Sequence, residues 1–154
     1  MKYLCTAPWT HTYVSPQGER RLCCASREEA KFTKQYLDSG GGSTDFNPVS
    51  LEEHWNSDYM KDIRKSMLAG EAIPQCALCN DNILNLHTYR KYFTETLFPH
   101  KIQDIIDNTD ETAHTNLHPI SYDYRISNLC NFKCRMCGEQ LSSSWETEKR
   151  EHNK

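Results

Sequence analysis

The sequence predicts a small α+β protein, and three observations support that fold class. Strand-forming residues stand on both sides of a turn signal at Ser15-Pro16-Gln17-Gly18. Two Ser-x-x-Glu capping boxes precede segments with helical patterns. Residues 120–127 are rich in Tyr and Ile, which favour a strand.

The first expected element is a β-hairpin within residues 3–24. We expect this whole segment to be extended, because strand-forming residues precede the turn and residues 20–24 return after it. Such a hairpin carries Cys5 at one end and Cys23 at the other.

The capping boxes predict one helix over residues 27–37 and another that begins at Leu51. A glycine-rich segment over 38–43 follows the first helix and is expected to be a flexible loop. The second helix carries apolar residues at four-residue steps as far as Met67. Gly70 is a suitable residue to end it.

The rest of the chain alternates between helical and extended patterns. Pro74 is expected to end helical structure just before Cys76. The remaining expected elements are a helix over 83–98, a short helix over 101–108, a polar linker over 110–119, a strand over 120–127 and the start of a last helix from 142 onward.

Composition excludes several classes of protein. The 154 residues carry a net charge of −3 and lack the basic surface that binds nucleic acid. The mean hydropathy is −0.79, and no apolar run approaches the roughly 18–20 residues that cross a membrane. The opening residues lack the apolar core of a signal peptide, so a reducing, cytoplasmic environment is expected.

Cysteine is over-represented, and its spacing is informative. In a reducing environment thiols bind metal or react more often than they form disulfides. Three thiols within eight residues favour one metal centre. The eight cysteines fall into three groups: Cys5 with Cys23 and Cys24, Cys76 with Cys79, and Cys130 with Cys134 and Cys137.

The Cys130-x3-Cys134-x2-Cys137 run is the most specific pattern. A [4Fe–4S] cluster is held by cysteine thiolates, and three of them leave one iron open to an external ligand. The alternatives are a zinc site and a helix face, because spacings of four and seven also align on a helix. The sequence Asn128-Leu129-Cys130-Asn131 is poor helix sequence, which favours a loop.

Residues Leu129 to Gly138 resemble the signature loop of the radical S-adenosylmethionine (radical SAM) superfamily. The resemblance implies that Cys130, Cys134 and Cys137 hold a [4Fe–4S] cluster whose open iron binds the amino and carboxylate groups of S-adenosylmethionine. In that superfamily one electron cleaves the sulfonium, and the resulting 5′-deoxyadenosyl radical takes a hydrogen from the substrate. This sequence has Met136 where an aromatic residue is usual. The resemblance implies that this apolar side chain packs against the adenine.

The N-terminal part resembles a twitch domain, the shortened relative of the SPASM domain found on radical SAM enzymes. The resemblance rests on Cys5-x2-Pro8-Trp9, Gly18-x4-Cys23-Cys24, the Leu51–Met60 segment, Arg64, Gly70-Glu71 and Cys76-x2-Cys79. It implies an auxiliary [4Fe–4S] cluster with four ligands, Cys5, Cys23, Cys76 and Cys79. Cys24 could replace Cys23, and the sequence leaves both open.

A structural zinc site is the alternative for the N-terminal cysteines. Zinc accepts four thiolates, and Cys-x2-Cys is a zinc spacing as well. On that hypothesis the chain is a non-catalytic zinc-binding interaction module. A thioredoxin-like site at Cys76 and Cys79 requires a surrounding βαβ unit, whereas the flanking segments have helical patterns.

The resemblances divide the chain into residues 1–109, a SPASM-like auxiliary domain with a helical extension, a linker over 110–119, and residues 120–154. The last part is the first strand and cluster loop of a (β/α)6 radical SAM barrel. Six barrel units need about 190 residues, so we expect a truncated barrel, a strand with unpaired edges and no turnover by this chain alone. No catalytic side chain is assigned.

The resemblance implies further partners. The substrate is a peptide or a small molecule, and the electron donor is a protein such as flavodoxin or ferredoxin. Neither nucleic acid nor a membrane is expected as a partner.

Overall fold

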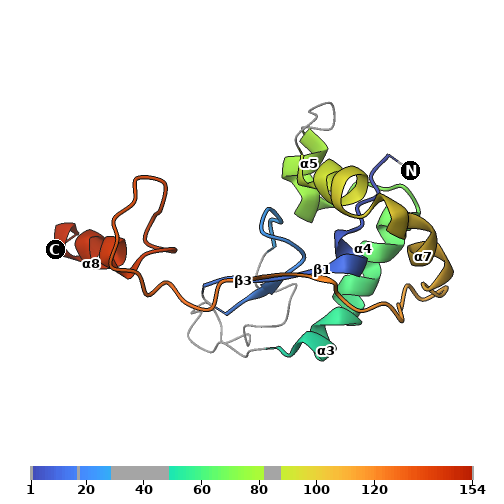
Figure 1. Cartoon of the computed structure of the whole chain (residues 1–154), viewed down its shortest axis with the longest axis horizontal. Coiled ribbons are helices and arrows are strands. Elements are labelled where there is room, and N and C mark those ends of the chain that lie inside the picture. The colour runs from blue at the N-terminus through green and yellow to red at the C-terminus, as the bar shows by residue number, and fades with distance from the viewer. Residues whose placement is uncertain (1, 17, 29–48, 82–87, 154) are drawn as a thin grey trace.

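The computed structural model describes residues 2–16, 18–28, 49–81 and 88–153. The expected loop at 38–43 and nearly all of the expected helix at 27–37 lie outside these residues. Helices α4, α5 and α7 gather at one end of the molecule, and α8 lies with the cysteine loop at the other (Figure 1). Strands β1 and β3 run between the two ends.

The predicted hairpin is confirmed, with β1 at His11–Val14 and β2 at Arg20–Arg21. The strands are antiparallel and pair Tyr13 with Arg21. Gly18 closes the turn by donating its N–H to the Ser15 carbonyl over 2.9 Å. Its φ of 83° lies in the left-handed region that glycine adopts without strain.

The prediction of extended chain is wrong just before the hairpin, where residues Ala7–Thr10 form the short helix α1. Pro8 lies in the first turn of α1, where its fixed φ suits a helix and its missing N–H costs no hydrogen bond. The Thr10 hydroxyl also donates to the Thr6 carbonyl over 2.9 Å. These local bonds outweigh the extended pattern.

Strand β3, at Ser121–Tyr124, confirms the strand expected within 120–127. It pairs in parallel with β1, so the described sheet has the order β2-β1-β3. The expectation that both edges of this strand are unpaired is therefore wrong for one edge. Strand β2 pairs with one edge of β1. Along the other edge, the Thr10 carbonyl accepts a hydrogen bond from the Ile120 amide, and the Val14 carbonyl accepts one from the Arg125 amide.

The helix expected from Leu51 is divided into α3 at Leu51–Trp55 and α4 at Asp58–Leu68. The capping box of Ser50 with Glu53 is confirmed, with bonds of 3.1 and 2.9 Å in its two directions. The break occurs because Ser57 acts as a second N-cap, accepting a hydrogen bond from the Met60 amide.

Short helical turns follow α4. Gly70, with φ of 75°, ends that helix as predicted. The prediction of a helix over 83–98 is wrong at Thr88, because the backbone of this residue is extended and it caps the start of the next helical turn. Residues 82–87 lie outside the described part of the chain. The turns are η1 at Pro74–Cys76, α5 at Ala77–Asp81, α6 at Tyr89–Lys91, η2 at Tyr92–Leu97, η3 at Pro99–Lys101 and α7 at Ile102–Asp107.

The last two predicted helices are confirmed. Helix α7 lies within the expected 101–108, and α8 occupies Ser143–His152 with Ser142 as its N-cap. In the described part of the chain no helix is both long and apolar enough to span a membrane.

The hydrophobic core lies entirely in the N-terminal part. Most of its buried members come from the α1 region, α4, η2 and α7, and they include Trp9, Met60, Ile63, Met67, Phe93 and Ile105. Within residues 120–153, only Ser142 is buried. The C-terminal part is therefore held by surface contacts and not by a core of its own.

The polar segment at 110–119 packs against this core by hydrogen bonds. Trp55 Nε1 donates to the Leu117 carbonyl over 2.7 Å. The Asn56 amide group pairs with the Thr115 backbone in both directions, at 3.1 Å each. This segment leads directly into β3, so its attachment places β3 beside β1.

Candidate metal centres

The four cysteines expected in the N-terminal site come from three separate parts of the fold. Cys5 precedes α1, Cys23 follows β2, Cys76 ends η1 and Cys79 lies in α5. Cys76 is half-buried and the other three are buried. None forms a disulfide, since all eight cysteines of the chain are free thiols.

Electrostatic interactions indicate that these four thiols lie in one region of the fold. The thiol of Cys5 interacts with those of Cys23, Cys76 and Cys79. Cys76 also interacts with Cys23 and Cys79. Residues separated by more than 70 positions in sequence are thus brought to one side of the hydrophobic core.

Burial favours the protonated form of Cys5, Cys23 and Cys76 in the metal-free protein. It raises the pKa of Cys5 to about 11 and that of Cys76 to about 12. It raises the pKa of Cys23 well above its ordinary value as well. Metal binding at this site therefore has to displace protons from the thiols.

Cys24 faces a different environment from Cys23. Burial raises the pKa of its thiol, which interacts with Asp123 and Arg125 beside β3 and accepts a hydrogen bond from the Tyr89 hydroxyl. Cys23 interacts with the neighbouring Cys24 and also with Cys5 and Cys76. Of the two adjacent cysteines, Cys23 is the one whose side chain shares the environment of the other thiols.

A buried arginine fixes the turn that follows Cys5. Arg64 Nε donates to the Pro8 carbonyl over 3.0 Å, and its Nη1 donates to Asn56 Oδ1 over 2.8 Å. Its guanidinium lies 5.0 Å from the centroid of the Trp55 ring. Arg64, in α4, therefore joins α1 to the break between α3 and α4, a few residues after Cys5 in the chain.

A second buried arginine lies at the thiols themselves. Arg90, in α6, acts on Cys5 and Cys76 through its charge and donates to the Cys79 carbonyl over 3.4 Å. Sequence reasoning missed it, because a single arginine in a helical pattern carries no signal of burial. Only the placement of α6 against the cysteines identifies it.

The thiols are gathered but are not arranged as a finished metal site. In the described part of the chain, no group of three or more Cys, His, Asp or Glu side chains is positioned to hold a metal ion. Cysteine side chains reorient about a single bond, χ1, between staggered positions. Metal binding at the four N-terminal thiols therefore requires reorientation of their side chains.

The second set of cysteines lies in the loop between β3 and α8, at the other end of the molecule (Figure 1). Cys134 is exposed, and Cys130 and Cys137 are half-buried. The start of α8 holds this loop. The Ser143 amide donates to the Asn128 carbonyl over 2.8 Å, and the Ser142 hydroxyl donates to the Phe132 carbonyl over 2.7 Å.

Trp145 provides a further bond from α8 to the loop. Its Nε1 donates to the Cys134 carbonyl over 3.1 Å. Lys133 lies 6.0 Å from the centroid of the Trp145 ring and pairs with Glu148. The sequence placed a helix start here but gave no indication that its serines and tryptophan bind the cysteine loop.

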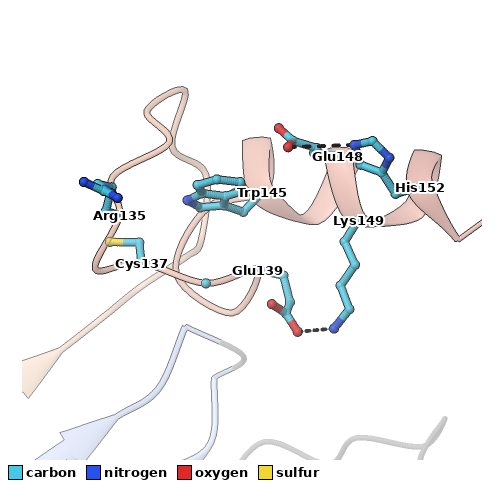
Figure 2. A pocket seen from close by; sticks show the side chains of 8 residues that line it. Arg135, Cys137, Glu139, Trp145, Glu148, Lys149 and His152 are labelled. Carbon is cyan, nitrogen blue, oxygen red and sulfur yellow. Dashed lines mark hydrogen bonds and ion pairs between the residues drawn. The ribbon is translucent and has the colours of Figure 1, made fainter.

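A cavity of about 390 Å³ opens between α8 and the cysteine loop. Figure 2 shows the loop residues Arg135, Cys137 and Glu139 opposite Trp145, Glu148, Lys149 and His152 of α8. Glu139 and Lys149 form an ion pair across the opening. Cys137 is the one cysteine of the motif that lines this cavity, whereas Met136 is 91% exposed and does not.

One comparison with known proteins concerns the N-terminal part of the chain. Residues 5–80 match the family model of SPASM, an iron–sulfur cluster-binding domain. No curated protein and no solved structure matches the chain. The match spans all four gathered cysteines, and it supports a SPASM-like domain and iron–sulfur cluster binding in this part of the protein.

Proposed function

We propose that this chain is part of a radical SAM enzyme with an N-terminal auxiliary iron–sulfur domain. In the proposal Cys5, Cys23, Cys76 and Cys79 bind an auxiliary [4Fe–4S] cluster. Cys130, Cys134 and Cys137 bind a second cluster together with S-adenosylmethionine. The single observation that carries the proposal is the gathering of the four N-terminal thiols inside the region that matches the SPASM domain.

The chemistry of the N-terminal residues fits a cluster. Four thiols from distant parts of the chain share one buried environment, and thiolate is the ligand that iron–sulfur clusters take. Arg90 lies beside them as a buried positive charge, which suits an anionic group. Four protein ligands leave no open position, so this site would serve electron transfer or structure.

The C-terminal motif has a different character that fits a site for an external ligand. Its three cysteines lie in an exposed loop, beside a cavity that also contains charged groups of both signs. A cluster bound there supplies one electron for the reductive cleavage of S-adenosylmethionine. The chain's own residues hold the loop in place through Ser142, Ser143 and Trp145, and the proposal leaves Met136 free to pack against the adenine.

The proposal extends to partners and setting. A peptide or small-molecule substrate gives up the hydrogen, and a flavodoxin- or ferredoxin-like protein donates the electron. Free thiols at all eight cysteines are consistent with a reducing, cytoplasmic environment.

Anaerobic reconstitution with iron and sulfide tests the proposal. We expect about eight irons and eight sulfides per chain, which corresponds to two [4Fe–4S] clusters. A triple variant, Cys130→Ala with Cys134→Ala and Cys137→Ala, should retain about four of each. Cys24→Ala is the matched control, because its thiol faces Tyr89, and it should retain all the iron.

Three results would contradict the proposal in different ways. A colourless protein with stoichiometric zinc would favour the non-catalytic zinc module. About four irons in both parent and triple variant would show that the exposed loop binds no cluster. Loss of iron in Cys24→Ala but not in Cys23→Ala would overturn the assignment of Cys23.

A further inference from the structure

Arg90 is a buried cation without a carboxylate partner in the described structure. The residue is 6% exposed. Nη2 donates to Asn80 Oδ1 over 2.5 Å and Nη1 to the Cys79 carbonyl over 3.4 Å. Within the described residues Nε has no hydrogen-bond partner, and no acidic side chain forms an ion pair with this guanidinium. A buried charge in this situation is costly unless an opposite charge accompanies it.

The groups around Arg90 identify where that opposite charge would come from. Its charge acts on the thiols of Cys5 and Cys76, and it is bonded to the backbone of Cys79. The Tyr3 ring lies 5.5 Å from the guanidinium carbon and covers another side. Three of the four gathered cysteines thus lie around one arginine, and cysteine binds metal as the negatively charged thiolate.

We propose that Arg90 is the counter-charge of the auxiliary site, and that it sets the reduction potential of the cluster held by Cys5, Cys23, Cys76 and Cys79. This inference rests on the proposed function. Arg90 acts through its charge and through its hydrogen bond to the Cys79 carbonyl, so it is a positioning residue and not a ligand. It lies ten residues beyond the end of the region that matches the SPASM domain.

The expected effect follows from the charge of the site. Four thiolates and a [4Fe–4S]²⁺ core carry a total charge of −2, and one electron from an external reductant changes it to −3. No bond forms or breaks and no proton is taken up. A fixed positive charge stabilises the −3 state more than the −2 state, so Arg90 raises the reduction potential.

The test uses the full chain with Cys130, Cys134 and Cys137 all changed to Ala, so that only the auxiliary site can bind iron. The variants Arg90→Gln, Arg90→Lys and Lys91→Gln are made in this background. Each is reconstituted anaerobically and titrated with dithionite and mediators while the visible absorbance is recorded. Iron content and circular dichroism report cluster loading and folding separately.

Removal of the charge should shift the potential. For Arg90→Gln we expect the ratio of reduced to oxidised cluster at a fixed potential to fall roughly tenfold, a shift of about 59 mV to more negative values. Arg90→Lys keeps the charge and should retain most of the parent potential. Lys91→Gln removes the same charge from the same helix at a less buried position, and it should leave the potential unchanged.

The outcomes separate this inference from the proposed function. Full iron loading with an unchanged potential in Arg90→Gln would overturn the role of Arg90 alone. If Arg90→Gln folds but loses its iron and Arg90→Lys keeps it, the counter-charge role is supported through loading. If both folded variants lose iron equally, the role is steric and the inference is wrong. A parent protein that binds no iron would overturn both proposals.

Discussion

The two cysteine sets occupy opposite environments within one chain. The N-terminal thiols lie beside the hydrophobic core, and burial raises the pKa values of at least three of them. The C-terminal cysteines lie in a loop where Cys134 is exposed and only Ser142 nearby is buried. Burial suits a site closed by four protein ligands, whereas exposure suits a site that admits a ligand from outside.

The two sets also differ in how they are held. The N-terminal thiols depend on contacts between residues far apart in sequence, as in the Arg64 bond to the Pro8 carbonyl. The C-terminal loop is held by α8, within fifteen residues of the cysteines themselves. Changes at the first set should therefore affect the whole protein, and changes at the second should stay local.

The largest expected difference concerns cysteine replacement in the iron-loaded protein. Cys79→Ala should remove about four irons and lower the free energy of unfolding by at least about 3 kcal/mol, because metal binding at a buried site contributes to folding. Cys134→Ala should also remove about four irons. Its unfolding free energy should change by less than about 1 kcal/mol, since the residue is exposed.

Iron analysis and anaerobic urea unfolding of the two variants measure this difference. Equal losses of stability in both would show that the exposed loop is as tightly integrated as the buried thiols. The contrast between the two sets would then fail.

A smaller effect is expected from pH, through His54 in α3. Burial and the nearby Arg20 and Arg64 charges lower the pKa of His54 to about 4 from 6.5. The neutral form is therefore favoured by folding. The resulting stability is complete above about pH 6.5 and is lost as the pH falls towards 4, by up to roughly 3 kcal/mol.

Urea unfolding of metal-free protein at pH 7 and pH 4.5 checks this prediction. His54→Phe should lose most of the pH dependence, while His152→Gln on the exposed end of α8 should keep it. If the unfolding free energy of His54→Phe still changes between pH 7 and pH 4.5 as much as that of the parent protein, the effect belongs to other groups of the N-terminal part.

The smallest effect is expected at the loop. Trp145→Phe keeps an aromatic ring but removes the bond to the Cys134 carbonyl, at a cost of about 1 kcal/mol. Hydrogen exchange of the amides in residues 130–137 should become roughly fivefold faster. Thr147→Ala, which removes a bond within α8, is the control and should leave the loop unchanged. Equally faster exchange throughout the N-terminal core in Trp145→Phe would contradict a local role.

Local signals predicted several elements because their causes are local. The Ser50 capping box, the Gly70 helix end and the hairpin turn at Gly18 each depend on residues within four positions of one another. The predicted continuous helix beyond Leu51 failed at Ser57 for a related reason. Ser57 begins a new helix within a segment whose apolar residues recur at helical spacing, and that spacing alone does not reveal the break.

The candidate sites were predictable only in part. Cysteine spacing singled out the Cys76–Cys79 pair and the Cys130–Cys137 run, whose members are close in sequence, whereas only the resemblance to a twitch domain joined Cys5 and Cys23 to the pair. Cysteine spacing did not identify Arg90, Arg64 or Trp145, whose roles depend on how one element of the fold packs against another. The parallel pairing of β3 with β1 was also missed, since it joins strands more than 100 residues apart.

The sequence by itself determined the short-range features: the helix starts, the turn and the Cys-x2-Cys and Cys-x3-Cys-x2-Cys spacings. Backbone hydrogen bonds and side-chain caps act over a few residues, so their signals are visible in the sequence. Tertiary structure decided that Cys23 faces Cys5 and Cys76 while Cys24 faces Tyr89. Burial and electrostatic contacts depend on which surfaces pack together, and that follows only from the whole fold.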